Sequence, residues 1–165
     1  MIVRATAKTQ ALVGRPEAID LTASGGNWYA NVIRIEGRKC LLVTHADTLF
    51  SVFVPDVRAS QLRPLGPFLV PLIVGQLTVE GLPADALGVL DPSRMIIAKT
   101  ADRKVLGCMN DLTFACGRAA ADRGGLAHLE LDRLHHHLHR NLNSTRGYVP
   151  AIDLAHDRAR RASHP

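Results

Sequence analysis

The sequence predicts a single α+β domain in which an antiparallel sheet of about four or five strands carries helices mainly on one face. Length and composition support one core, because the 165 residues are 47% hydrophobic and a chain of this size needs neither a disulfide nor a metal to fold. The order of the segments supports the fold class, since most strand-like segments precede the long helix-like ones. No internal repeat of solenoid period is present.

The N-terminal third of the chain has the alternation of apolar and polar residues that is typical of strands. Residues 1–6 predict a short strand, and a brief helix is expected at 9–14. Three further runs, at 28–35, 39–44 and 48–54, are rich in β-branched and aromatic residues and are separated by turn residues. We expect these three runs to pair as an antiparallel meander.

Beyond the meander, apolar residues recur at spacings of three and four, which is typical of helices. Pro67 can begin a helix there, and Pro71 should kink it one turn later. A strand is expected at 94–99, and helices are expected at about 103–123 and 126–141. These helices are the elements that should cover the sheet.

The expected helix at 103–123 has two stripes of residues. One stripe is apolar, and the second contains small residues that include Gly107 and Gly117. A glycine inside a helix costs about 1 kcal/mol relative to alanine. We therefore expect this helix to be buried on both sides, with the two glycines allowing another backbone to approach closely.

The segment 149–165 is basic and shows no sustained apolar pattern. We expect it to be a mobile tail that follows a domain spanning residues 1–148. The longest apolar run, 68–74, is too short to cross a bilayer, so no membrane contact is expected. The N-terminus lacks the apolar stretch of a signal peptide and the three cysteines are widely spaced, so we expect a cytoplasmic protein.

The net charge of +5 comes mainly from arginine, whose planar fork suits phosphate and carboxylate groups. Candidate contacts for an anion or a nucleic acid are Arg38, Lys39, Arg103 and Lys104. A solvated hairpin tip is the alternative explanation for the first two of these residues. A charge of this size is also ordinary for a soluble domain, so composition alone does not establish a nucleic-acid partner.

A second set of polar residues could line the pocket of a small enzyme. This set consists of Asn31, Thr44, Asp102, Asn110 and Asp111. Asp102 can equally cap the helix that follows it. Asn110 and Asp111 can equally satisfy backbone groups at a strand end or loop.

Five histidines are concentrated on the expected helix at 126–141. Metal ligands could come from His128, His135, His136 and His139, which form two pairs at helical spacing. No glutamate stands where a zinc hydrolase needs its base, and a third ligand would have to come from His45, Asp153 or His156. We therefore expect no metal and no cofactor, and interpret the helix as a solvated face.

Three short motifs carry a resemblance to a known family. They are W-x-A-N at 28–31, G-x-M-N-D-L at 107–112 and L-N-x-T at 142–145. With them, the chain resembles a bacterial family described only as a domain of unknown function, over residues 1 to about 148. The chain departs from the resemblance at Arg146, where a proline is expected. The resemblance implies one domain and a bacterial cytosolic source, and it supplies no mechanism.

The leading hypothesis from the sequence is a small cytosolic binding or regulatory module that contacts nucleic acid. One alternative is a small enzyme whose polar pocket lies around Asn110 and Asp111. The other is an interaction protein that forms a homodimer or binds another protein through its sheet edge or its last helix.

Overall fold

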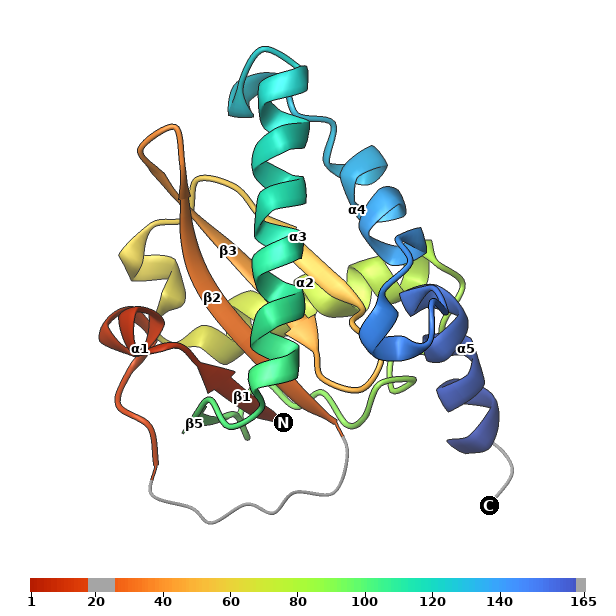
Figure 1. Cartoon of the computed structure of the whole chain (residues 1–165). Coiled ribbons are helices and arrows are strands. Elements are labelled where there is room, and N and C mark those ends of the chain that lie inside the picture. The colour runs from red at the N-terminus through yellow and green to blue at the C-terminus, as the bar shows by residue number, and fades with distance from the viewer. Residues whose placement is uncertain (18–25, 163–165) are drawn as a thin grey trace.

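The computed structural model describes residues 1–17 and 26–162, which form one domain around a five-stranded sheet (Figure 1). Along the sheet the strands stand in the order β4-β3-β2-β1-β5. The strands are β1 (Ile2–Ala5), β2 (Asn27–Ile35), β3 (Arg38–His45), β4 (Ser51–Val54) and β5 (Ile96–Lys99). The helices are α1 (Ala7–Val13), α2 (Leu65–Val79), α3 (Arg103–Asp122), α4 (Leu131–Arg140) and α5 (Ala151–Ala162). Short 3-10 turns lie at Ala59–Leu62, Leu126–His128 and Ser144–Arg146.

The α+β class is confirmed, but the expectation of a purely antiparallel sheet was wrong. The strands β2, β3 and β4 form the antiparallel meander, whereas β1 pairs in parallel with both β2 and β5. The parallel pairs arise because the chain returns to the sheet by crossover connections: α1 lies between β1 and β2, and α2 lies between β4 and β5. The sheet is therefore mixed.

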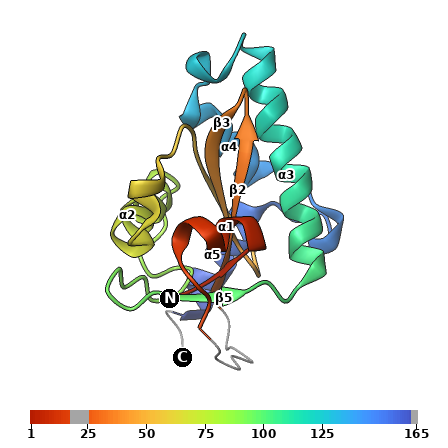
Figure 2. The same ribbon diagram turned by 90° about the vertical axis from the view of Figure 1, so that its left-hand side faces the viewer.

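Helices cover both faces of the sheet, which corrects the expectation that they lie mainly on one. Figure 2 shows the sheet nearly edge-on, with α2 on one side and α3 on the other. Residues of α1, α2 and α5 share a core with Trp28, whereas residues of α3 and α4 share a second core with Tyr29. Neighbouring residues of a strand point to opposite faces, so β2 and β3 are apolar on both faces and carry an almost continuous buried run.

The helix α3 is buried on one side only, contrary to the sequence-based expectation. Phe114, in the second stripe, is 73% exposed. No heavy atom outside the adjacent chain lies within 4 Å of a Cβ built on Gly107 or Gly117. The close backbone approach occurs at Gly66 in α2 instead, where a Cβ would overlap the carbonyl group of Pro92.

Residues 151–162, which we expected to belong to a mobile tail, form α5 and contribute to the core of the domain. Ile152, Ala155 and Ala159 are buried in the core that contains Trp28. Two of these three residues are alanines, so the helix presents a small apolar face that a search for large aliphatic residues overlooks. The last three residues of the expected tail lie outside the described residues.

Candidate functional site

A hollow of about 390 Å³ lies between α1 and the hairpin formed by β2 and β3. It is lined by Lys8, Ala11, Leu12, Val32, Arg34 and Lys39, and we call it the basic hollow. Three of these six residues are cationic, and none is acidic.

Simple periodicity brings the lining residues together. Lys8, Ala11 and Leu12 are separated by three and four positions, so they share one face of α1. Val32 and Arg34 are two positions apart on β2 and therefore lie on the same face of the sheet. The register of the hairpin places Lys39 directly opposite Arg34.

The basic hollow leaves positive charge uncompensated. Like charges at directly opposite positions of an antiparallel pair repel each other and destabilise the sheet. Arg34 donates a hydrogen bond to the carbonyl oxygen of Gly37 at 3.0 Å, which does not neutralise it. The ammonium groups of Lys8 and Lys39 have no hydrogen bond or ion pair with a side chain of the described residues. An anion held here would relieve the repulsion.

Of the four predicted anion contacts, only Lys39 lines the basic hollow. Arg38 forms an ion pair with Asp56 at 3.2 Å, with both side chains more than half exposed. Arg103 and Lys104 begin α3, which starts near the beginning of β2.

The orientation of α3 follows from its two ends. The backbone N–H of Asp102 donates to the hydroxyl of Tyr29, at the start of β2, at 3.0 Å. The backbone N–H of Leu126, just after the helix, donates to the carboxylate of Glu36 in the hairpin turn at 3.1 Å. Arg38 and Lys39 therefore lie at the opposite end of α3 from Arg103 and Lys104, and the four residues form no single patch.

The residues of the predicted polar pocket make separate contacts on different elements. Asn31 is buried on β2 and accepts a hydrogen bond from the hydroxyl of Thr6 at 3.1 Å. Thr44 is fully buried, and its hydroxyl lies 2.9 Å from that of Ser51.

On α3, the three remaining members of that set do not complete a pocket. Asp102 caps the helix by accepting from the backbone N–H of Lys104 at 2.7 Å, which is the alternative role considered from the sequence. Asn110 and Asp111 are exposed on the helix surface. Solvent is available to both side chains, so neither needs a buried partner.

The histidines of α4 divide between a buried pair and an exposed group. His128 and His136 are exposed, whereas His135 and His139 are buried. The pair at i and i+4 closes the outer edge of β4: Nε2 of His135 accepts from the backbone N–H of Phe53 at 2.9 Å, and Nε2 of His139 lies 2.8 Å from the carbonyl oxygen of Ser51. Two imidazoles thus occupy positions that a neighbouring strand would otherwise fill.

His135 is neutral in this arrangement. Burial, reinforced by nearby His139, lowers its pKa from 6.5 to about 4. Its Nε2 must keep a lone pair in order to accept from Phe53, and its Nδ1 is buried without a hydrogen-bond partner in the described structure. A ring in this state is a hydrogen-bond acceptor for the strand.

His139 belongs to a charged cluster, buried at the histidine and Glu80 side chains and exposed at Arg140, that sequence analysis did not identify. Its Nδ1 lies 2.8 Å from Oε1 of Glu80, at the end of α2, and Arg140 donates to both oxygens of the same carboxylate at 2.8 and 2.9 Å. The hydrogen bonds from Arg140 outweigh burial and lower the pKa of Glu80 to about 2. We call Glu80, His135, His139 and Arg140 the edge cluster.

These contacts leave the histidines engaged in the fold. Burial lowers the pKa of His139, whereas its hydrogen bonds to Glu80 and Ser51 raise it. Its ring also stacks on Phe50 with 3.9 Å between the centroids. Within residues 1–17 and 26–162, no three His, Cys, Asp or Glu side chains gather where they could hold one metal ion. In the same ranges no helix has the length and apolarity needed to cross a membrane.

The two cationic residues that sequence reasoning missed in the basic hollow are Lys8 and Arg34. A signal for Arg34 exists, because a two-residue turn at Glu36–Gly37 fixes the register and places Arg34 opposite Lys39. Lys8 carries no such signal, since its position depends on how α1 packs beside β2.

Comparison with known protein families gives a match over most of the chain. The model of a family described as a domain of unknown function (DUF6933) matches residues 2–154. No curated protein and no solved structure matches the chain. The matched range includes the three motifs, two of which meet in the structure: Sγ of Cys108 lies 3.0 Å from the hydroxyl oxygen of Thr145.

Proposed function

The chain belongs to this domain-of-unknown-function family, DUF6933, and we propose that it is a small binding module that contacts the phosphate backbone of nucleic acid through the basic hollow. The family description carries no activity. The proposal therefore rests on the hollow itself.

One observation carries the proposal: three cations from two separate parts of the chain converge on a hollow that has no acidic residue. Arg34 and Lys39 stand directly opposite each other, and Lys8 faces them from α1. A phosphate group between them would replace repulsion with attraction. Phosphate contacts of this kind supply most of the affinity of sequence-independent nucleic-acid binding.

The lining also favours a backbone contact over recognition of bases. The uncharged lining residues are Ala11, Leu12 and Val32, and the hollow has no aromatic ring on which a base could stack. A module of this kind would bind duplex and single-stranded nucleic acid with little sequence preference, and its affinity would fall steeply with salt.

The test is a binding titration with labelled random-sequence duplex DNA and single-stranded RNA at several salt concentrations. The double variant Arg34→Gln/Lys39→Gln should weaken binding. It should also reduce the slope of log K against log salt by about 2, because each lost duplex phosphate contact contributes about 0.9.

The matched control is Arg94→Gln/Arg118→Gln, which removes the same charge from exposed side chains elsewhere. This control should keep most of the slope. An equal loss in both double variants would show that only net charge matters, and absence of binding at low salt would overturn the proposal.

The proposal includes a bacterial cytosolic setting. Cys40, Cys108 and Cys116 are all buried and form no disulfide, which suits a reducing compartment. Cell fractionation of the native host checks this setting, and recovery of the protein outside the cytosol would contradict it.

A further inference from the structure

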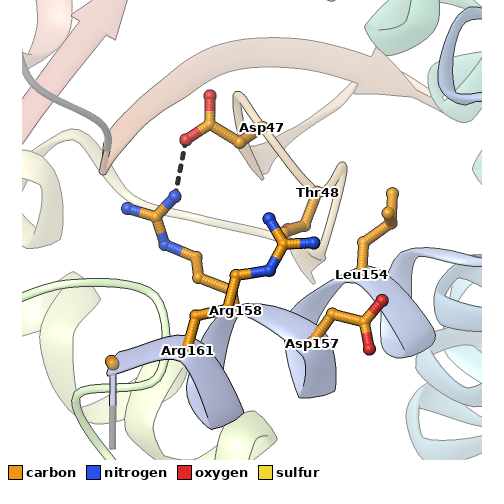
Figure 3. A pocket seen from close by; sticks show the side chains of 7 residues that line it. Asp47, Thr48, Leu154, Asp157, Arg158 and Arg161 are labelled. Atoms are coloured by element: carbon orange, nitrogen blue, oxygen red, sulfur yellow. Dashed lines mark hydrogen bonds and ion pairs between the residues drawn. The ribbon is translucent and has the colours of Figure 1, made fainter. Parts of the chain in front are cut away.

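We propose a second anion site, separate from the basic hollow, that takes the oxyanion group of a small organic ligand. It occupies a hollow of about 430 Å³ between α5 and the turn that joins β3 to β4. We call it the arginine hollow, and it is lined by Asp47, Thr48, Leu154, Asp157, Arg158, Arg161 and Ala162 (Figure 3).

The helix presents its lining residues on one face. Leu154, Asp157, Arg158 and Arg161 are spaced by three, four and seven positions, which places them in one row on α5. Figure 3 shows the side chains of Arg158 and Arg161 extending from α5 toward the turn that carries Asp47 and Thr48. Two guanidinium groups thus line the same hollow. Arginine is the residue type best suited to bind phosphate and carboxylate groups.

Hydrogen bonds fix the opposite wall. Arg146 donates to the backbone carbonyl oxygens of Ala46 at 2.6 Å and Asp47 at 3.0 Å. The hydroxyl of Thr48 lies 3.0 Å from Nδ1 of buried His45 and accepts from the backbone N–H of Phe50 at 3.2 Å. These hydrogen bonds hold the turn in place where it faces the two arginines, which reduces the entropy lost in ordering the site around a ligand.

The ion pairs within the hollow leave the guanidinium group of Arg161 available to a ligand. Arg158 pairs with Asp47 at 2.8 Å, and Arg160 pairs with Asp157. Arg161 has no hydrogen bond or ion pair with any residue in the described ranges. An incoming oxyanion can bind Arg161 directly and compete with Asp47 for Arg158. This competition is feasible because the side chains of Asp47 and Arg158 are 50% and 31% exposed, and exposed ion pairs contribute little.

The size of the hollow leaves room for more than a bare ion. A volume of about 430 Å³ is in the range of pockets that hold small organic molecules. Leu154 and Ala162 supply apolar contact for the organic part, and the carboxylate of Asp157 can accept from a hydroxyl or amino group. The shared chemistry is a phosphate or carboxylate group attached to a small polar molecule.

The test follows the Nε–Hε resonances of the arginine side chains by NMR while inorganic phosphate is added at constant ionic strength. We expect saturable shifts for Arg161 and Arg158. In a parallel titration with acetate, shifts would assign the site to oxyanions in general, whereas shifts with phosphate alone would assign it to phosphates. Absence of saturable shifts with both probes would overturn the proposal.

Variants separate a specific site from general charge. Arg161→Gln should abolish saturable binding, whereas Arg118→Gln, on the exposed side of α3, should preserve it. Equal losses would overturn the proposal. Lys39→Gln should leave phosphate binding at the arginine hollow unchanged, so this inference and the nucleic-acid proposal can fail independently.

The competing carboxylate gives the sharpest readout. Asp47→Asn keeps the size of the side chain and removes the partner of Arg158. It should tighten phosphate binding by about twofold to fivefold, the range expected for an exposed ion pair. A purely structural role for Asp47 would leave the affinity unchanged or weaken it, and either result would contradict the competition on which the site rests.

Discussion

The edge cluster and the basic hollow both bring charged residues together beside the sheet. They differ in whether those charges have partners of opposite charge. In the edge cluster, the carboxylate of Glu80 accepts from Arg140 and contacts His139, and the two histidines contact the backbone of β4. In the basic hollow, Arg34 and Lys39 face each other with no acid between them.

This difference distinguishes charged residues that stabilise the fold from charged residues that are available to bind a ligand. A buried polar group that has a hydrogen-bond partner contributes to stability, and removing it leaves that partner buried without a hydrogen bond, which costs free energy. Cations that remain unpartnered at the surface contribute little to stability and stay available to a ligand. Variants at the edge cluster should therefore change folding, and variants at the basic hollow should change binding. The following experiments test that division.

The largest expected effect is from His139→Ala. This change removes the partner of the Ser51 carbonyl, one partner of Glu80 and the ring that stacks on Phe50. Loss of buried partners of this kind should lower the free energy of unfolding by about 3 kcal/mol or more, measured by urea denaturation. His136→Ala, on the exposed side of the same helix, should change it by less than about 0.5 kcal/mol. Similar losses of unfolding free energy in the two variants would contradict the distinction between buried and exposed histidines of α4.

The next effect is a loss of stability in mild acid. The pKa of His135 is about 4 in the folded protein and 6.5 ordinarily, so the unfolded chain binds more protons between these values. Stability should fall as the pH drops from 6.5 to 4, by up to about 3 kcal/mol from this residue. Burial also lowers the pKa of His45 to about 4, which adds to the same window.

A second acid window belongs to Glu80, whose pKa falls from 4.5 to about 2 on folding. The stability that it contributes is present above pH 4.5 and is lost as the pH falls toward 2. Urea denaturation at a series of pH values measures both windows. In His135→Gln the slope between pH 6.5 and 4 should become shallower, and an unchanged slope would contradict the assignment.

A smaller effect is expected on binding from Lys8→Gln. Because Lys8 reaches the basic hollow from α1, its loss should reduce the salt slope of duplex DNA binding by about 0.9, as for one phosphate contact. The free energy of unfolding should stay within about 0.5 kcal/mol. A loss of stability without a change in slope would place Lys8 with the structural residues instead.

The smallest effect is a gain. Arg34→Gln removes the repulsion with Lys39 and should stabilise the free protein by a few tenths of a kcal/mol. The gain should disappear at about 0.5 M salt, where exposed charges are screened. Destabilisation at low salt would show that the hydrogen bond from Arg34 to Gly37 outweighs the repulsion.

The sequence predicted the elements of the fold better than their arrangement. Local periodicity is sufficient for the meander and for α3, whose observed bounds lie close to those expected. The pairing of β1 with β5 joins residues more than 90 positions apart, and no local pattern encodes it. The helix α5 escaped prediction because its buried face consists mainly of alanines.

The lining of the basic hollow, our candidate site, can be predicted only in part from the sequence, for a similar reason. Lys39 was identified because it is basic and close to a turn, whereas Lys8 joins it through tertiary packing. His135 and His139 stand four positions apart, a spacing that suits both metal binding and contact with a strand edge. The sequence alone does not indicate which of these partners faces the helix. Glu80 stands alone at the end of α2, and only the folded structure places it beside His139.

The contacts of His135 and His139 with the outer edge of β4 also bear on aggregation of the protein. An uncovered strand edge offers its N–H and C=O groups to the strands of other molecules and is a common starting point for aggregation. In β4 the outward N–H of Phe53 and the outward carbonyl oxygen of Ser51 contact the imidazole rings of His135 and His139. Protonation of His135 near pH 4 replaces its lone pair with an N–H and frees the N–H of Phe53. Strand-to-strand assembly of acidified protein should therefore begin at residues 51–54, and colloidal stability should depend on the charge of one buried ring.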